Sequence, residues 1–274
     1  KWWEKTKKAL RESKLVSVPT KRTDPLVLRE ASASPGEALV EDLDMARSAR
    51  GRVKALEAIQ REAPLVASVE GLLKTAFAIV NDAALKLVKL SPAQSLELIA
   101  LRDEIADEVK QGDAIEPSAP KISDILLVAE STLSDDLNQV AAARLKRILE
   151  AFPVAFGEDW VPQILKVFGR ISSRGVSEIA KLLAEREEAT KLNEHIRIAL
   201  SRHALGPDSL AWICRERKKA SSEVFGGAVG SVILTVLEQD SMDDGPRRSG
   251  RLGNLLMDDR ELIPDLLEGM ELND

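Results

Sequence analysis

Hydrophobic positions recur at helical spacing from residue 34 onward. They follow steps of three and four residues with one heptad step, which predicts one long amphipathic helix from Ser34 to about Glu62. The segment Ser34-Pro35-Gly36-Glu37 has the pattern of a capping box, with a serine N-cap, a proline in the first turn and a glutamate at the third position. The apolar positions of this predicted helix are Leu39, Leu43, Ala46, Val53, Leu56 and Ile59.

Two further helices are predicted before residue 112. Residues 65–90 form a thoroughly apolar stretch, and Ser91-Pro92-Ala93-Gln94 repeats the capping signature at the start of a helix to about Gln111. Together the three helices predict an antiparallel bundle over residues 34–111. Residues 112–120 (GDAIEPSAP) contain one glycine and two prolines, so we expect a linker there.

The helices predicted after this linker are shorter. They are paired and return about every 35 residues, the length scale of HEAT and tetratricopeptide repeats. No segment reads as a strand, so the sequence predicts an all-α fold: an N-terminal arm and helical bundle followed by short antiparallel helix hairpins resembling a solenoid over 121–274. The expected helices are 121–132, 135–151, 158–169, 174–188, 191–204, 207–218, 221–238, 248–256 and 259–269.

Residues 1–33 differ from the rest in charge. The first 30 residues carry nine Lys or Arg and four acidic residues, a net charge of +5, whereas the whole chain has a net charge of −6. A short amphipathic helix from Trp2 to about Ser13 is followed by Pro19 and Pro25, which favour an extended course. Such a basic arm could bind nucleic acid, an acidic protein partner or the acidic remainder of its own chain, or it could be an ordinary solvated surface.

The arm also holds the residues that we expect to bind a partner. Trp2 and Trp3 are adjacent and cannot share one helical face, so one of them stays exposed unless this chain or a partner covers it. The predicted partner-binding residues are Trp2, Trp3, Lys7, Lys8, Lys21 and Arg22.

Catalytic and metal chemistry find little support in the sequence. One cysteine and two histidines exclude a disulfide framework and a thiolate zinc site, and we expect neither a metal nor a cofactor. A hydrolase using Ser201, His203 and Asp208 is the weakest alternative, because no G-x-S-x-G motif accompanies these residues. Cys214 follows apolar helical neighbours and is expected to be buried.

The sequence also gives an expectation for the cellular location of the protein and for the extent of the chain. No run approaches 18 apolar residues and no signal segment opens the chain, so we expect a cytoplasmic protein without membrane contact. The chain begins at Lys1, which indicates a piece of a longer protein.

Several segments resemble the helical N-terminal extension of long bacterial members of the GreA/GreB transcript cleavage factor family. They are Lys1-Trp2-Trp3, Lys7-Lys8, Val18 to Pro25, Ala211 to Arg215 and Leu255 to Ile263. The resemblance implies a non-catalytic extension that contacts RNA polymerase or an associated protein.

In that family the activity lies in a helical hairpin whose tip carries acidic residues that hold a metal ion. The tip reads roughly G-D-L-x-E-N, and Gly112 to Pro117 (GDAIEP) is similar to it. Pro117 replaces the asparagine, however, and Pro120 precedes any return helix, so we interpret the match as coincidence.

The sequence therefore predicts a non-catalytic helical interaction module, with a GreA/GreB-like extension as its specific form. The alternative is a nucleic-acid-binding helical module that uses the basic, tryptophan-containing arm.

Overall fold

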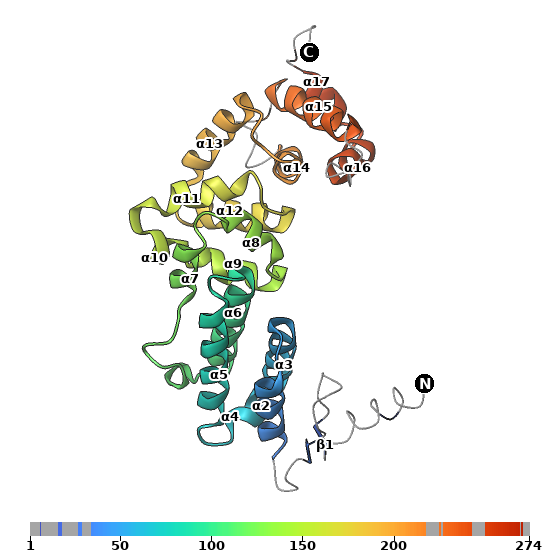
Figure 1. Ribbon diagram of the computed structural model, residues 1–274. Coiled ribbons are helices and arrows are strands. Elements are labelled where there is room, and N and C mark those ends of the chain that lie inside the picture. The colour runs from blue at the N-terminus through green and yellow to red at the C-terminus, as the bar shows by residue number, and fades with distance from the viewer. Residues whose placement is uncertain are drawn as a thin grey trace. The chain divides into compact units, whose positions relative to one another are not determined.

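The computed structural model describes residues 34–217, 227–242 and 250–268, together with residues 6, 16–17, 27–28, 225 and 270. The predicted all-α fold is confirmed, since helices make up almost all regular structure in this part of the chain (Figure 1). The exception is a pair of two-residue antiparallel strands, β1 (Val16–Ser17) and β2 (Val27–Leu28). The prediction of no strand is wrong there, because β-branched valines favour pairing of extended backbone.

The chain divides into two compact units, residues 1–128 and 129–274. The segment 112–120 lies within the first unit and contains the 3-10 helix η1 (Gly112–Ala114). The division falls after Val128, at the end of α7 (Ile122–Val128).

The first unit begins with two helices where one was predicted. α2 (Pro35–Met45) starts at the predicted capping box, in which the Glu37 N–H donates to Ser34 Oγ over 3.2 Å. Ala46 has an extended backbone, and Ser48 caps α3 (Ala49–Arg61) by accepting from the Gly51 N–H over 3.0 Å. The single long helix is therefore wrong, because a second serine cap restarts the helix within it.

The remaining helices of the first unit surround α6 (Pro92–Val109). The predicted helix 65–90 is replaced by α4 (Ala63–Ala67) and α5 (Leu72–Leu87), separated by a left-handed Gly71. Ser91 precedes α6 without a side-chain cap, so its predicted capping box does not form. α6 contacts α3, α4, α5 and α7 and buries residues on several sides, which places the core of this unit around it.

The second unit is made of short helices. The predicted helix 135–151 is two helices, because Val140 and Ala141 are extended, and a further short helix opens at Phe152-Pro153. The helices are α8 (Leu133–Gln139), α9 (Ala142–Glu150), α10 (Phe152–Phe156), η2 (Gly157–Asp159), α11 (Trp160–Phe168), α12 (Ser173–Glu185), α13 (Ala189–Ser201), α14 (Pro207–Glu216), α15 (Gly227–Met242), α16 (Gly250–Asp258) and α17 (Leu262–Leu267).

Two rows of helices run through the second unit. In one row α9, α12, α14 and α16 pack in succession, and in the other α11, α13, α15 and α17 do so (Figure 1). α12 also contacts both α11 and α13, which joins the rows. Packing of this kind, neighbour upon neighbour, is typical of helix-hairpin repeats. The HEAT- or tetratricopeptide-like assignment itself stays a prediction.

Aliphatic side chains form most of the core, as the low aromatic content requires. The exceptions include Phe168, whose ring meets that of Trp212 edge to face at 5.8 Å between centroids. Trp212 and Cys214 are buried, which confirms the prediction for Cys214.

Candidate functional site

The six predicted partner-binding residues lie outside the described residues. They are Trp2, Trp3, Lys7, Lys8, Lys21 and Arg22. Their role in binding therefore stays a prediction, and the candidate site below comes from the described helices.

The geometry does not favour a hydrolase built on Ser201, His203 and Asp208. The Ser201 hydroxyl donates to the Ile198 carbonyl over 2.8 Å, so its proton is directed to the backbone of its own helix. His203 is exposed in the turn after α13, where its φ is 51°. Asp208 lies in the first turn of α14.

The GDAIEP segment likewise lacks the form of a hairpin tip. Gly112–Ala114 form one turn of 3-10 helix and Ile115 is extended. The next helix begins only at Ile122, so two helices do not meet at this tip.

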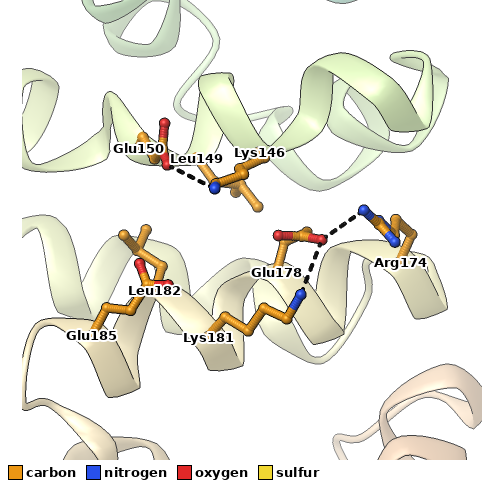
Figure 2. Close-up of a pocket in the computed structure, with 8 residues that line it drawn as sticks. All are labelled: Lys146, Leu149, Glu150, Arg174, Glu178, Lys181, Leu182 and Glu185. Atoms are coloured by element: carbon orange, nitrogen blue, oxygen red, sulfur yellow. Dashed lines mark ion pairs between the residues drawn. The ribbon is translucent and has the colours of Figure 1, made fainter.

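A charged groove of about 400 Å³ lies between α9 and α12 (Figure 2). Long side chains on its two walls lie over the buried side chains of Leu149 and Leu182. The lining residues are Lys146, Leu149, Glu150, Arg174, Glu178, Lys181, Leu182 and Glu185. We call this the α9–α12 groove.

Glu178 is the buried charge of the α9–α12 groove. Its side chain is 5% exposed, and its Oε1 lies 2.9 Å from Arg174 Nη2 and 3.8 Å from Lys181 Nζ. A buried carboxylate is unfavourable unless cations and hydrogen bonds compensate it. Arg174 and Lys181 therefore compensate the charge of Glu178, while their own side chains are more than 60% exposed.

The opposite wall carries its own ion pair. Lys146 Nζ lies 3.7 Å from Glu150 Oε1, one turn apart on α9. Both walls change sign in the same direction, from Lys146 to Glu150 on α9 and from Lys181 to Glu185 on α12. Figure 2 shows Glu150 and Glu185 at the same end of the groove.

A second hollow of about 400 Å³ lies between the start of α8, α11 and α13. His195 lines it and meets Phe168 edge to face, at 6.4 Å between ring centroids. Burial lowers the pKa of His195, which favours the neutral imidazole. On its rim Lys166 Nζ donates to Gln163 Oε1 over 3.1 Å, and Gln163 Nε2 donates to Glu130 Oε1 over 2.6 Å.

An ion-pair cluster around the buried Arg217 joins the end of α14 to the last two helices. Arg217 Nε donates to Asp265 Oδ2 over 2.7 Å and its Nη1 donates to Asp259 Oδ2 over 2.8 Å. Nη1 also donates to the Cys214 carbonyl over 3.1 Å. These contacts raise the pKa of Arg217, chiefly through the hydrogen bond to Asp265.

Within the described ranges, no group of three or more His, Cys, Asp or Glu side chains is arranged to hold a metal ion. Nor does any described helix have the length and apolar character needed to cross a bilayer.

Comparison with known proteins gives one partial match. The family model described as the GRAD helix-turn-helix domain matches residues 1–33. No curated protein and no solved structure matches the chain.

Sequence reasoning did not identify the α9–α12 groove. The α12 wall of the groove does have a signal in the sequence. Its charges alternate in sign at helical steps of four, three and four residues, at Arg174, Glu178, Lys181 and Glu185. Nothing in the sequence, however, indicates that Lys146 and Glu150 lie opposite this stripe.

Proposed function

We propose that this chain is a non-catalytic helical interaction module that binds a protein partner. The observation that carries the proposal is the packing of the second unit into two rows of short helices, with the charged α9–α12 groove between two members of one row. Helices packed in this manner build extended surfaces that repeat proteins use for binding.

More specifically, we propose that the partner is RNA polymerase or a protein associated with it. This more specific proposal rests on the resemblance of residues 1–3, 7–8, 18–25, 211–215 and 255–263 to the extension of GreA/GreB-family factors. The family model that matches residues 1–33 describes a helix-turn-helix domain and not a transcript cleavage factor, so it does not support RNA polymerase as the partner.

The test is co-migration of the chain with core RNA polymerase in gel filtration at low and moderate salt. We expect a complex that the double variant Trp2→Ala/Trp3→Ala weakens, because large aromatic side chains dominate many interfaces. A chain that elutes alone under both conditions would contradict the proposal that RNA polymerase is the partner.

A second candidate function is nucleic-acid binding through residues 1–33. Two observations favour it: the helix-turn-helix family match and the net charge of +5 over the first 30 residues. A helix-turn-helix places its second helix in the DNA major groove, and lysines neutralise phosphates.

Labelled 30-nucleotide duplex and single-stranded DNA distinguish the two functions. Binding to duplex that falls steeply between 50 and 200 mM salt, with no polymerase complex, would favour the nucleic-acid function. Reversal of Lys7, Lys8, Lys21 and Arg22 to glutamate should then abolish the complex.

A further inference from the structure

Positive charge is concentrated around two turns of the second unit, the turn between α11 and α12 and the turn between α13 and α14. Residues 160–177 and 195–207, which include these turns, contain no acidic side chain. Their cationic residues are Lys166, Arg170, Arg174, Arg197 and Arg202. The two segments therefore carry a net charge of +5, in a chain whose net charge is −6.

Packing brings these two turns together. The Gly206 N–H donates to the Gly169 carbonyl over 2.9 Å, and the Ser209 hydroxyl donates to the Phe168 carbonyl over 2.7 Å. A Cβ added at Gly169 would lie only 3.1 Å from the Ala204 carbonyl oxygen, so the two backbones are in direct contact. The two cationic segments therefore form one surface.

Two arginines of this surface are free to bind an external anion. Arg170 and Arg202 are exposed, and neither side chain has an ion-pair partner within the part of the chain that the structure describes. The dipoles of α11 and α13 favour cations just after the helix ends, so neither arginine requires a carboxylate there. Lys166 Nζ donates to a neutral group, the Gln163 side-chain oxygen, over 3.1 Å. We call Lys166, Arg170 and Arg202 the cationic cluster.

The hollow of about 400 Å³ between the start of α8, α11 and α13 lies beside the cationic cluster. Lys166 and Arg170 line it directly, and so does Ala204, two residues after Arg202. Three buried apolar side chains also line it, those of Leu133, Val167 and Ala199. The hollow thus offers apolar contact to one large side chain of a partner, with cations at its edge.

We infer that the cationic cluster and the hollow bind an acidic segment of a protein partner that carries one aromatic residue. Carboxylates of this segment lie at Lys166, Arg170 and Arg202, since arginine binds carboxylates through paired hydrogen bonds. The aromatic side chain fills the hollow, as anchor residues do in many interfaces. This inference rests on the proposed protein-binding function and specifies the chemistry of the partner.

A nucleic acid fits this surface less well, because acidic residues line the other side of the hollow. Glu130 and Asp135, near the start of α8, belong to the same lining as Lys166 and Arg170. A nucleic acid carries a phosphate at every nucleotide, so a strand that crosses the hollow meets these carboxylates. A peptide avoids them when its acidic residues all lie on one side of its aromatic residue.

The test is calorimetric titration of the full chain with acetylated, amidated peptides in about 50 mM salt. The peptides GSFGDEDDG and GDDEDGFSG place four acidic residues after or before one phenylalanine. Each has two controls, one with alanine in place of the phenylalanine and one with lysine in place of all four acidic residues. We expect one acidic peptide to bind about tenfold more tightly than either of its controls, through burial of the ring and through ion pairs. The net charge of −6 would by itself favour the lysine peptides.

Charge reversal of the two free arginines supplies the decisive variant. Arg170→Glu/Arg202→Glu should weaken binding of the acidic peptide about tenfold, because attraction at two positions becomes repulsion. The matched control is Arg50→Glu/Lys54→Glu on α3, which changes the net charge equally at two exposed cations of the first unit and should leave binding unchanged. If charge reversal alters the circular dichroism spectrum, Arg170→Gln/Arg202→Gln removes the charges without adding acids and should weaken binding in the same direction.

A third variant tests the hollow by itself. Ala204 is exposed and lines the hollow, so Ala204→Leu places a larger side chain at its edge without changing a buried position. The preference for phenylalanine over alanine in the acidic peptide should disappear. The preference for acidic over lysine peptides should remain, because the cationic cluster is unchanged.

Four results would each overturn the inference: tighter binding of the lysine peptides, equal weakening by the charge reversals on the two units, an unchanged preference for phenylalanine in Ala204→Leu, and binding of single-stranded DNA but of no acidic peptide. The proposed function fails separately. A polymerase complex formed by a chain that binds no acidic peptide would keep the protein-binding function and overturn the inference. Binding of the acidic peptide without a polymerase complex would support the inference and remove RNA polymerase as the partner.

Discussion

At the scale of single residues, Arg217 has a role that only the folded chain defines. Its guanidinium group is nearly buried and joins the end of α14 to carboxylates 42 and 48 residues further along the chain. Sequence patterns could predict the buried Cys214 from its helical neighbours. They could not predict the Arg217 pairs, because Asp259 and Asp265 read equally well as acids that favour the start of α17.

Replacing Arg217 with methionine should destabilise the second unit. The variant leaves Asp259, Asp265 and the Cys214 carbonyl without their common donor, and we expect a loss of about 1–3 kcal/mol because both carboxylates stay partly exposed. Urea unfolding followed by circular dichroism measures the loss. Lys86→Met, which removes one partner of an exposed pair, should change stability by less than about 0.5 kcal/mol; equal losses in the two variants would contradict the assigned role.

Cys214 should make stability fall at high pH. Burial raises the pKa of its thiol to about 12, whereas an unfolded thiol ionises near pH 8.5–9. Above pH 9 the unfolded chain therefore binds fewer protons than the folded chain, so the free energy of unfolding decreases as pH rises.

The expected slope from Cys214 is about 1.4 kcal/mol per pH unit between pH 9 and pH 11. It is measured as the difference between the natural chain and Cys214→Ala in urea unfolding at each pH. Parallel curves for the two proteins would show that the thiol ionises normally in the folded state.

At the scale of helices, a local signal predicted the start of the first helix of the bundle. Ser34 and Glu37 gave the start of α2, because a capping box satisfies backbone donors through neighbours in sequence. The break at Ala46 was missed because the apolar steps continue through it. For the α9–α12 groove, the alternating stripe on α12 is visible in the sequence, but its partner wall is set by tertiary packing.

Two glycines in the last three helices should respond oppositely to alanine. A Cβ at Gly230 in α15 would lie 2.8 Å from the Leu266 carbonyl oxygen of α17, so Gly230→Ala should destabilise their packing by about 1–3 kcal/mol. A Cβ at Gly253 in α16 meets nothing within 4 Å, and Gly253→Ala should stabilise by about 0.5–1 kcal/mol. Thermal unfolding of both variants measures the contrast, and a stabilised Gly230→Ala would show that α15 and α17 do not approach so closely.

At the scale of the whole molecule, the sequence predicted the all-α class. It predicted a domain boundary at residues 112–120, whereas the two compact units divide after Val128. Proline and glycine at 112–120 indicate irregular backbone there. They do not reveal that α7 packs onto α6, which keeps residues up to Val128 in the first unit. For the two helix rows, the sequence predicted only the length of the paired helices. It did not predict which helices pack on one another, because that order depends on long-range contacts.

Packing of neighbour upon neighbour predicts a gradient of local stability in the second unit. α17 contacts α15 at the end of its row, whereas α12 packs against α9, α11, α13 and α14. Terminal elements of such arrays open with less free energy than internal ones. Hydrogen exchange followed by mass spectrometry should show faster exchange in residues 250–268 than in 173–185; the reverse order would contradict the two-row packing.

The edge-to-face contact between Trp212 and Phe168 also allows the packing of α14 to be followed by intrinsic tryptophan fluorescence. The chain contains four tryptophans and no tyrosine, so its ultraviolet emission comes almost wholly from indole rings. Trp212 is 8% exposed and should emit at short wavelength while α14 stays docked on α11. Trp212→Phe would remove that component of the spectrum, and thus any event that loosens α14 becomes visible as a red shift without an attached dye.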